Sequence, residues 1–299
     1  MIYQIRFLAS RQRGFSLIEL LIGLLISSVI LAAVMSSFLS TKRSLARDTV
    51  YSRIQQNLEA ALNIIAQDIK NAGNLLNDLA PVFELTNGAG ASPDQLIIRR
   101  GLRIGALPVC QNITSGSSDL IYAGFVVWNL PGCIYSLQQG TFNIWDHYNL
   151  TNAPVLAYIY NVYSNVGEFF QLNSFTDTAN TNLTLSRVDT WTYGYTAGQA
   201  NVYLLEQKRY YISGNNLMMT TTGGPLSTNG NSLVAFNIKN IQITFSLNDG
   251  TTTSTFLPSN YWRVVKSVRV IITGFDSYLG EEVVKTAEGT FAVRASLTS

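Results

Sequence analysis

The sequence predicts an α+β fold in which one long N-terminal helix packs on an antiparallel β-sheet. Three observations favour it. An apolar segment runs from Phe15 to Leu39, an amphipathic helical pattern continues from it to Gly73, and strand-like stretches alternate with turn residues from about Gln95 onward. Charged residues make up 13% of the chain, about half of the usual roughly one quarter. Such a composition fits an extracytoplasmic, strand-rich domain better than a cytosolic enzyme.

The apolar segment from Phe15 to Leu39 is long enough to cross a membrane. As a helix it would rise by about 37 Å, compared with roughly 30 Å for a bilayer core, and it exceeds the apolar region of about 7–15 residues in a secretory signal peptide. Arg6, Arg11 and Arg13 precede it, and no acidic residue does. The positive-inside rule then places the N-terminus in the cytoplasm and the residues after Ser40 outside the inner membrane.

Glu19 is the only charged residue between Phe15 and Ser40. A carboxylate costs roughly 2.5 kcal/mol or more at the middle of a bilayer, and less near its interface. One interpretation is that Glu19 reaches the lipid headgroups and has no further role. The other is that Glu19 meets a positive charge supplied by a partner within the membrane.

After Ser40 the chain becomes polar without a helix-breaking residue. Apolar residues recur at spacings of three to five, which indicates one apolar stripe on a helix, and Gly73 suits a helix C-terminus. One helix therefore extends from about Phe15 to about Ala72. A membrane anchor followed by a coiled coil is the alternative, but the stripe covers only about four heptads. The stripe consists of Leu45, Val50, Ile54, Leu58, Ala61, Ile65 and Ile69.

Cys110 and Cys133 are the two cysteines of the chain. In an oxidising compartment they would form one disulfide, which closes a loop of about 24 residues and contributes ~3 kcal/mol in the loop-entropy model. The alternative is two unpaired, buried thiols. Export of this region by the apolar segment favours the disulfide.

The downstream region is rich in aromatic and β-branched residues, which predicts strands. Two hairpins are expected, one turning at residues 214–216 and one near residues 248–250. The central stretch, about 101–200, is interpreted as an insertion or a second lobe. The expected strands lie within residues 120–130, 154–164, 168–176, 181–188, 201–221, 233–256, 263–275 and 289–297.

The residue pattern does not indicate catalysis. His147 is the only histidine, it lies in an expected aromatic-rich loop, and no nucleophile motif or phosphate-binding loop accompanies it. Asp276, Glu281 and Glu282 could supply oxygen ligands to Ca²⁺, but their spacing is not that of an EF-hand and a solvated turn is the simpler interpretation. We therefore expect no catalytic residue, no metal site and no cofactor, and the near-neutral remainder of the chain does not suggest nucleic-acid binding.

The stretch RGFSLIEL resembles the class III signal sequence of type IV pilins and type II secretion pseudopilins. In that family a prepilin peptidase cuts after the glycine and methylates the new N-terminal residue. The resemblance implies cleavage after Gly14, N-methylation of Phe15 and an assembly role for Glu19. Glu19 would then pair with the N-terminal amine of a neighbouring copy.

The stretch YSRIQQNLEAALNIIAQDIKNAGNLL resembles the conserved helix of PilW-type minor pilins, with matches at residues 54–57 and 60–73. The strand pair VAFNIKNIQITFSLNDG and WRVVKSVRVIITG is similar to that of PilW-type and type II secretion J-type subunits. Major pilins usually have a proline in the membrane-spanning part of the helix, and this chain has none before Pro81. The resemblance implies a type IV pilin-like fold with a leader (1–14), a transmembrane half-helix (15–39), an amphipathic half-helix (40–73) and a periplasmic β-rich head (74–299).

The resemblance further implies a minor pilin that joins a membrane-anchored priming or tip complex for type IV pilus assembly. Its partners would be other minor pilins, the major pilin, the prepilin peptidase, the assembly platform and a tip adhesin. The subunit would span the inner membrane once, with a periplasmic head, and lie at the pilus base or tip after assembly. The alternatives are a J-like minor pseudopilin of a type II secretion system and a membrane-anchored adhesin or DNA-uptake subunit.

Overall fold

The computed structural model describes residues 16–77, 79–90, 92–102, 105–126, 130–152, 155–178, 181–223 and 231–293. The chain divides into two compact units, Met1–Ser52 and Arg53–Ser299. We call the second the head unit. The expected leader, residues 1–14 with Gly14 at its end, and the expected first mature residue, Phe15, lie outside the described residues.

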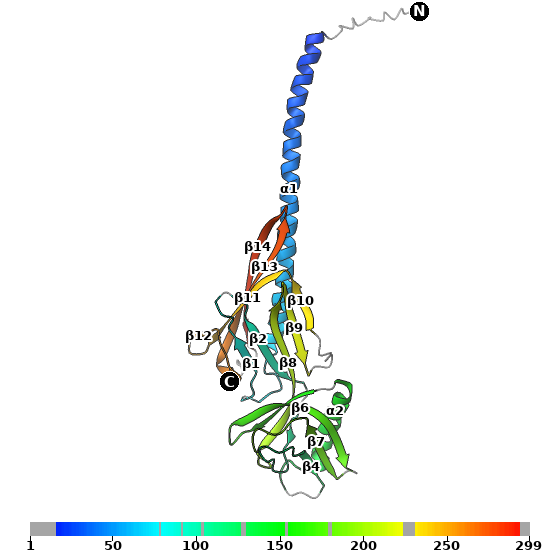
Figure 1. Cartoon of the computed structure of the whole chain (residues 1–299), viewed down its shortest axis with the longest axis vertical. Coiled ribbons are helices and arrows are strands. Elements are labelled where there is room, and N and C mark those ends of the chain that lie inside the picture. The colour runs from blue at the N-terminus through cyan, green and yellow to red at the C-terminus, as the bar shows by residue number, and fades with distance from the viewer. Residues whose placement is uncertain are drawn as a thin grey trace, which may run out of the picture. The chain divides into compact units, whose positions relative to one another are not determined.

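The long helix is present as one element, α1 (Leu17–Lys70), of 54 residues (Figure 1). Its bounds agree with the expected end points of about Phe15 and about Ala72 to within two residues. It ends where the sequence indicates, because Gly73 adopts a positive φ of 71° and its N–H donates to the carbonyl oxygen of Arg99 at 3.0 Å. A left-handed residue at this position is favourable for glycine and strained for other residues.

The part of α1 that belongs to the head unit packs on β-strands. Its Asn57 side chain donates to the carbonyl oxygen of Phe236 at 2.6 Å, and a Cβ placed at Gly274 would lie 3.0 Å from Leu58. The predicted apolar stripe is confirmed here, because its members after Arg53 are all buried. The buried apolar residues of this part are Ile54, Leu58, Ala61, Leu62, Ile65, Ala66 and Ile69.

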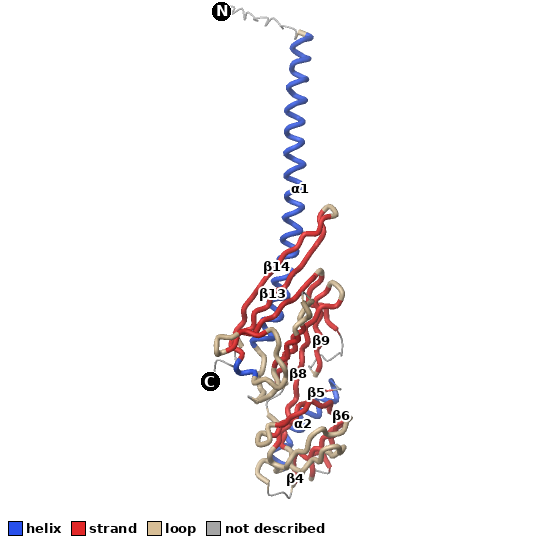
Figure 2. Tube along the Cα trace, turned by 60° about the vertical axis from the view of Figure 1, so that its left-hand side comes forward, coloured by secondary structure: helices blue, strands red, loops and turns tan. Residues whose placement is uncertain are grey.

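The strands form two sheets in which all the described strand pairs are antiparallel. The four-stranded sheet has the order β12 (Thr252–Thr253), β11 (Ile238–Leu247), β13 (Val265–Tyr278) and β14 (Glu281–Ala292). Figure 2 shows β13 and β14 side by side. The ten-stranded sheet contains β1 (Phe83–Thr86), β2 (Gln95–Gly101), β3 (Leu107–Pro108), β4 (Ile121–Phe125), β5 (Val155–Asn161), β6 (Val166–Thr178), β7 (Asn182–Arg187), β8 (Ala200–Ser213), β9 (Asn216–Thr222) and β10 (Asn231–Phe236).

Both predicted hairpins are confirmed. The β8–β9 pair closes at Ser213 and Asn216, and β11 turns into β12 through residues 248–251. The expected continuous strand at 233–247 is interrupted, because β10 pairs with β9 whereas β11 pairs with β13. The chain changes sheet at Asn237, whose φ is +54°, a conformation that asparagine tolerates better than most residues.

Strand β8 pairs with two different sets of strands along its length. Its second half pairs with β2 and β9 near α1, whereas its first half pairs with β3 and β5. Gly101 at the end of β2 lies opposite Leu205, so residues 102–199 form an insertion between two strands that pair with each other, and β3 to β7 within this insertion extend the same ten-stranded sheet. We call these residues the inserted lobe, which agrees with the expected insertion or second lobe.

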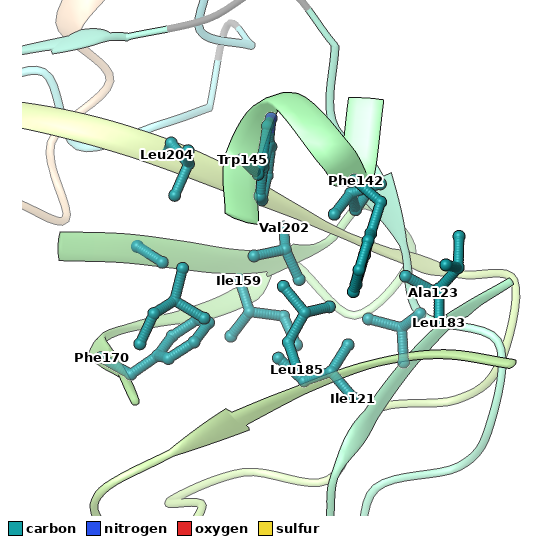
Figure 3. Close-up of a cluster of buried hydrophobic side chains, with 14 of the residues drawn as sticks. Ile121, Ala123, Phe142, Trp145, Ile159, Phe170, Leu183, Leu185, Val202 and Leu204 are labelled. Carbon is teal, nitrogen blue, oxygen red and sulfur yellow. The ribbon is translucent and has the colours of Figure 1, made fainter. Parts of the chain in front are cut away.

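The inserted lobe and the first half of β8 together enclose a hydrophobic core, shown in Figure 3, to which β8 contributes Ala200, Val202 and Leu204. The lobe contains α2 (Tyr135–Asn152), where the sequence led us to expect an aromatic-rich loop around His147. That expectation is wrong, because Tyr135, Phe142, Trp145 and Tyr148 recur on one face of a helix and are buried. His147 lies on the exposed side of α2.

Candidate functional site

The N-terminus of α1 carries the residues on which the sequence interpretation depends. Ser16 precedes the helix, and its hydroxyl and carbonyl oxygens accept from the backbone N–H of Glu19 at 3.3 and 3.1 Å. A serine at this position satisfies an N–H group that the first turn leaves without a partner, and an acid three residues later is favoured by the helix dipole. The sequence reasoning missed this capping role, although the Ser-x-x-Glu spacing is its usual signal.

The first half of α1 suits an apolar environment. The helix is long and apolar enough to cross a membrane by length and composition, and its large apolar residues between Leu17 and Leu39 are exposed. The hydroxyls of Ser27 and Ser28 donate to backbone carbonyl oxygens of their own helix at 2.7 and 2.8 Å. Their polar groups are thereby satisfied without water.

The Glu19 carboxylate differs from these hydroxyls. It forms no side-chain hydrogen bond or ion pair with any residue in the described part of the chain. It is therefore a charged group of this half-helix that needs a partner, or the headgroup region, when the segment lies in lipid.

The head unit is stabilised by one disulfide, between Cys110 and Cys133, whose Cα atoms lie 5.6 Å apart. Both residues are fully buried. The backbone around the bridge is also ordered by hydrogen bonds, because the N–H of Cys110 donates to the carbonyl oxygen of Tyr122 at 2.7 Å and the N–H of Phe125 donates to that of Cys133 at 2.9 Å. The disulfide thus joins the segment after β3 to the segment before α2.

A buried polar group links α1 to β8. Asp68 of α1 is 7% exposed, accepts from the Lys208 ammonium group at 2.7 Å and accepts from the hydroxyl of Tyr210. Burial, together with the neighbouring Asp68 carboxylate, raises the pKa of the Tyr210 hydroxyl. This contact fixes the rotation of the helix relative to the strand.

A partly buried carboxylate, Glu168 of β6, organises the loop after β7. Burial alone would raise its pKa, but the backbone N–H groups of Thr192 and Tyr193 and the Arg187 guanidinium group lower it. The Arg187 contact measures 3.2 Å, and the two N–H groups donate at 3.1 and 3.2 Å. The loop is therefore held against β6 by charge-assisted hydrogen bonds.

The acidic residues weighed as a calcium site, Asp276, Glu281 and Glu282, lie in the β13–β14 hairpin, and two of them bind cationic side chains. Asp276 accepts from Arg53 at 3.2 Å, and Glu282 accepts from Lys239 at 2.8 Å. Among the described residues, no group of three or more His, Cys, Asp or Glu side chains could hold a metal ion.

An aromatic cleft of about 480 Å³ opens in the head unit where the β5–β6 hairpin meets the loop before the short helix η1 (Trp262–Val264). Its aromatic lining residues are Tyr158, Tyr160, Phe169, Tyr193 and Tyr261. Sequence reasoning did not predict this cleft, because its walls, which also include Leu79 and Pro81, come from segments up to about 180 residues apart in the chain.

Comparison with known proteins supports the N-terminal interpretation. Residues 9–35 match the family model of the prokaryotic N-terminal methylation motif. No protein of curated function matches the sequence. Among solved structures, a type IV-like pilin from Thermus thermophilus is similar over 83% of this chain and 99% of its own, at a TM-score of 0.38 and 7% identity, which is a weak similarity. The chain thus carries an N-terminal methylation motif whose second part forms the beginning of the long apolar helix α1.

Proposed function

We propose that this chain is a minor pilin that joins a membrane-anchored priming or tip complex for type IV pilus assembly. The observation that carries the proposal is the methylation motif at residues 9–35, which continues into a 54-residue helix with Glu19 as its sole early charge. Prepilin peptidase would cut after Gly14 and methylate Phe15.

In this role Glu19 pairs with the N-terminal amine of a neighbouring subunit. Two opposite charges about 4 Å apart attract by about 4 kcal/mol at an effective dielectric constant of 20, whereas a carboxylate within a bilayer costs roughly 2.5 kcal/mol or more. The amine of a correctly placed neighbour can therefore offset the free-energy cost of placing Glu19 in the bilayer. The amine of a neighbour in the wrong register cannot. This supports a role for Glu19 in setting the register between subunits.

The continuity of α1 favours a minor pilin over a filament-forming subunit. No proline occurs before Pro81, so each backbone N–H within the helix is available for the regular pattern. The head would contact other minor pilins and the major pilin, with a tip adhesin and the assembly platform as further partners. The subunit itself would have no catalytic activity. Before assembly it would span the inner membrane once, with its head in the periplasm.

The mature N-terminus tests the proposal most directly. Mass spectrometry of the protein from cells with prepilin peptidase should show a chain that begins at N-methylated Phe15. The same protein from cells that lack the peptidase should begin at Met1. An unprocessed N-terminus in both strains would refute the proposal and leave an ordinary anchored domain.

A second experiment tests Glu19 and separates the pilus role from the J-like pseudopilin and adhesin alternatives. In a strain that lacks the native copy, Glu19→Ala should be processed normally but should fail to restore surface pili. Leu20→Gln is the matched control, because it adds a polar group at nearly the same depth and leaves Glu19 in place. Restored protein secretion with unaffected piliation would favour a type II secretion pseudopilin. Restored surface or DNA binding alone would favour an adhesin or uptake subunit.

A further inference from the structure

The aromatic cleft has a rigid floor. Tyr158 stacks near Tyr160, with ring centroids 6.1 Å apart and an interplanar angle of 18°, and lies 5.0 Å from the ring of Phe169. The guanidinium group of Arg99 lies 4.5 Å from the centroid of the Phe169 ring. Four packed planar groups leave little rotamer freedom, so the floor is preformed.

Glycine at position 167 makes this arrangement possible. A Cβ at Gly167 would overlap the hydroxyl and the Cζ atom of Tyr158, so only glycine lets the tyrosine ring lie against β6. Tyr160 is fixed as well, because its hydroxyl donates to Oδ1 of Asn165. That bond does not use the two N–H groups of the Asn165 carboxamide.

Two further rings stand at the rim. Tyr193 and Tyr261 are each 45% exposed, and both line the cleft. Their backbones are held in place, since the N–H of Tyr193 donates to Glu168 at 3.2 Å and the carbonyl of Tyr261 accepts from Val264 at 3.3 Å. Exposed rings on an ordered backbone offer flat apolar faces at a low entropic cost.

The polar groups of the cleft are neutral. They comprise the carboxamides of Asn165 and Asn260, the hydroxyl of Ser259 and the phenolic hydroxyls. None of the lining residues within the described ranges carries a charge. Arg99, which packs on Phe169, does not line the cleft; it is 4% exposed and is already paired with Glu84 at 2.9 Å. A ligand with a net charge would therefore find no free ion-pair partner among the lining residues, whereas a ligand with many hydroxyl groups would find both donors and acceptors.

We propose that this cleft binds a neutral oligosaccharide. A pyranose ring presents a face of C–H groups, which packs on an aromatic π face, and an equatorial belt of hydroxyls, which hydrogen-bonds to amides and hydroxyls. The volume of about 480 Å³ falls within the range of small-ligand sites. This inference goes beyond the assembly role proposed above and does not rest on it, because binding is a property of the single subunit.

An extended peptide fits the cleft less well. Peptides that bind along a sheet need a free strand edge for backbone hydrogen bonds. Strand β5, which supplies Tyr158 and Tyr160, is already paired on both edges, with β6 and with β8. The cleft therefore offers rings and side-chain polar groups, and β5 offers no backbone edge.

The test uses the full-length protein in nanodiscs, since an alkyl-glycoside detergent would itself compete for a sugar site. Calorimetric titration would use maltotetraose, cellotetraose, chitotetraose and mannotetraose, with tetragalacturonate as an anionic comparison. We expect at least one neutral tetrasaccharide to bind with a Kd of about 1 mM or lower. Tyr193→Ala and Tyr261→Ala should each weaken that binding by about tenfold.

The controls separate a cleft site from general effects of substitution. Tyr261→Phe keeps the ring and should retain most of the affinity. Tyr163→Ala removes a tyrosine that is 79% exposed and lies in the same β5–β6 turn outside the cleft lining, so it should leave the affinity unchanged. The proposal is overturned if no neutral sugar of the panel binds, if both cleft variants bind as well as the unsubstituted protein, or if only tetragalacturonate or an uncharged Thr-Val decapeptide binds.

Discussion

Replacement of Asp68 by alanine should strongly destabilise the head unit. The Asp68 side chain is 8% exposed, and its partner Lys208 is 20% exposed. Removal of the carboxylate leaves the Lys208 ammonium group without its ion-pair partner and the buried hydroxyl of Tyr210 without its acceptor. The hydroxyl of Tyr210 cannot reach bulk water, because Tyr210 is fully buried. The Lys208 ammonium group can reach it only in part, because its side chain is 20% exposed.

The expected loss follows from these two orphaned groups. A buried hydroxyl that loses its acceptor costs about 1–3 kcal/mol, and breakage of a buried ion pair costs about 3–5 kcal/mol. Lys208 keeps some contact with solvent, so the lower part of the second range applies. We expect Asp68→Ala to reduce the free energy of unfolding by about 4 kcal/mol, the sum of the lower values of the two ranges, which corresponds to a fall in Tm of about 8–16 °C for a unit of this size.

The assay is thermal and denaturant unfolding of the full-length protein in nanodiscs, followed by tryptophan fluorescence. Glu59→Ala is the matched control, because Glu59 is an exposed acid on the same part of α1 and accepts only from Gln55, one turn away, at 2.8 Å. Such an exposed pair contributes a few tenths of a kcal/mol, so this variant should unfold nearly as the unsubstituted protein does.

A double-mutant cycle identifies the cause of the loss. In the Asp68→Ala background, Lys208→Met should recover part of the stability, because it removes the orphaned charge and keeps the apolar stem. Equal stability of Asp68→Ala and Glu59→Ala would refute the argument, since it would mean that the buried contact between α1 and β8 contributes nothing.

Three other predictions concern the head unit. Burial and the hydrogen bond to Asp177 raise the pKa of Tyr135 to about 12, so its contribution to stability is fully present below about pH 10 and is lost as the pH rises through about 12; Tyr135→Phe should remove this part of the alkaline dependence in pH-resolved unfolding. Gly73→Ala places a Cβ 2.5 Å from the Trp262 ring at a φ of +71°, so it should lower the free energy of unfolding by about 2–3 kcal/mol in denaturant titration. Cys110→Ser opens the disulfide loop and should cost about 3 kcal/mol, whereas the same substitution under reducing conditions should change little.

The candidate site divides into a part that the sequence predicts and a part that it does not. Glu19, the apolar helix and its end at Gly73 follow from local patterns, because hydropathy, charge and glycine act within a few residues along the chain. The capping serine at position 16 was also readable from the Ser-x-x-Glu spacing, and helix α2 was readable from the spacing of Phe142, Trp145 and Tyr148. Helix α2 was missed because the aromatic content of its region was interpreted as a loop, and the capping serine was missed because the Ser-x-x-Glu spacing was read only as part of the signal sequence.

The aromatic cleft and the Asp68 contact could not be predicted in the same way. Asp68 lies 140 residues from Lys208 in the chain, and the cleft is assembled from the β5–β6 hairpin and a loop about a hundred residues later. Strand β8 pairs with β2 along its second half and with β5 along its first half. This pairing decides which of these side chains come into contact. Such pairing depends on packing between distant segments and has no local signature.

By itself the sequence determined the helix, its division into an apolar and an amphipathic half, the positions of the hairpin turns and the cysteines available for a bridge. Each of these depends on the chemistry of neighbouring residues and on regular helical or strand periodicity. Only the tertiary structure decided that the chain changes sheet at Asn237, that residues 102–199 enclose a hydrophobic core together with the first half of β8, and that five aromatic rings line one cleft. The physical reason is that long-range strand pairing and side-chain packing select among arrangements that local propensity leaves equally favourable.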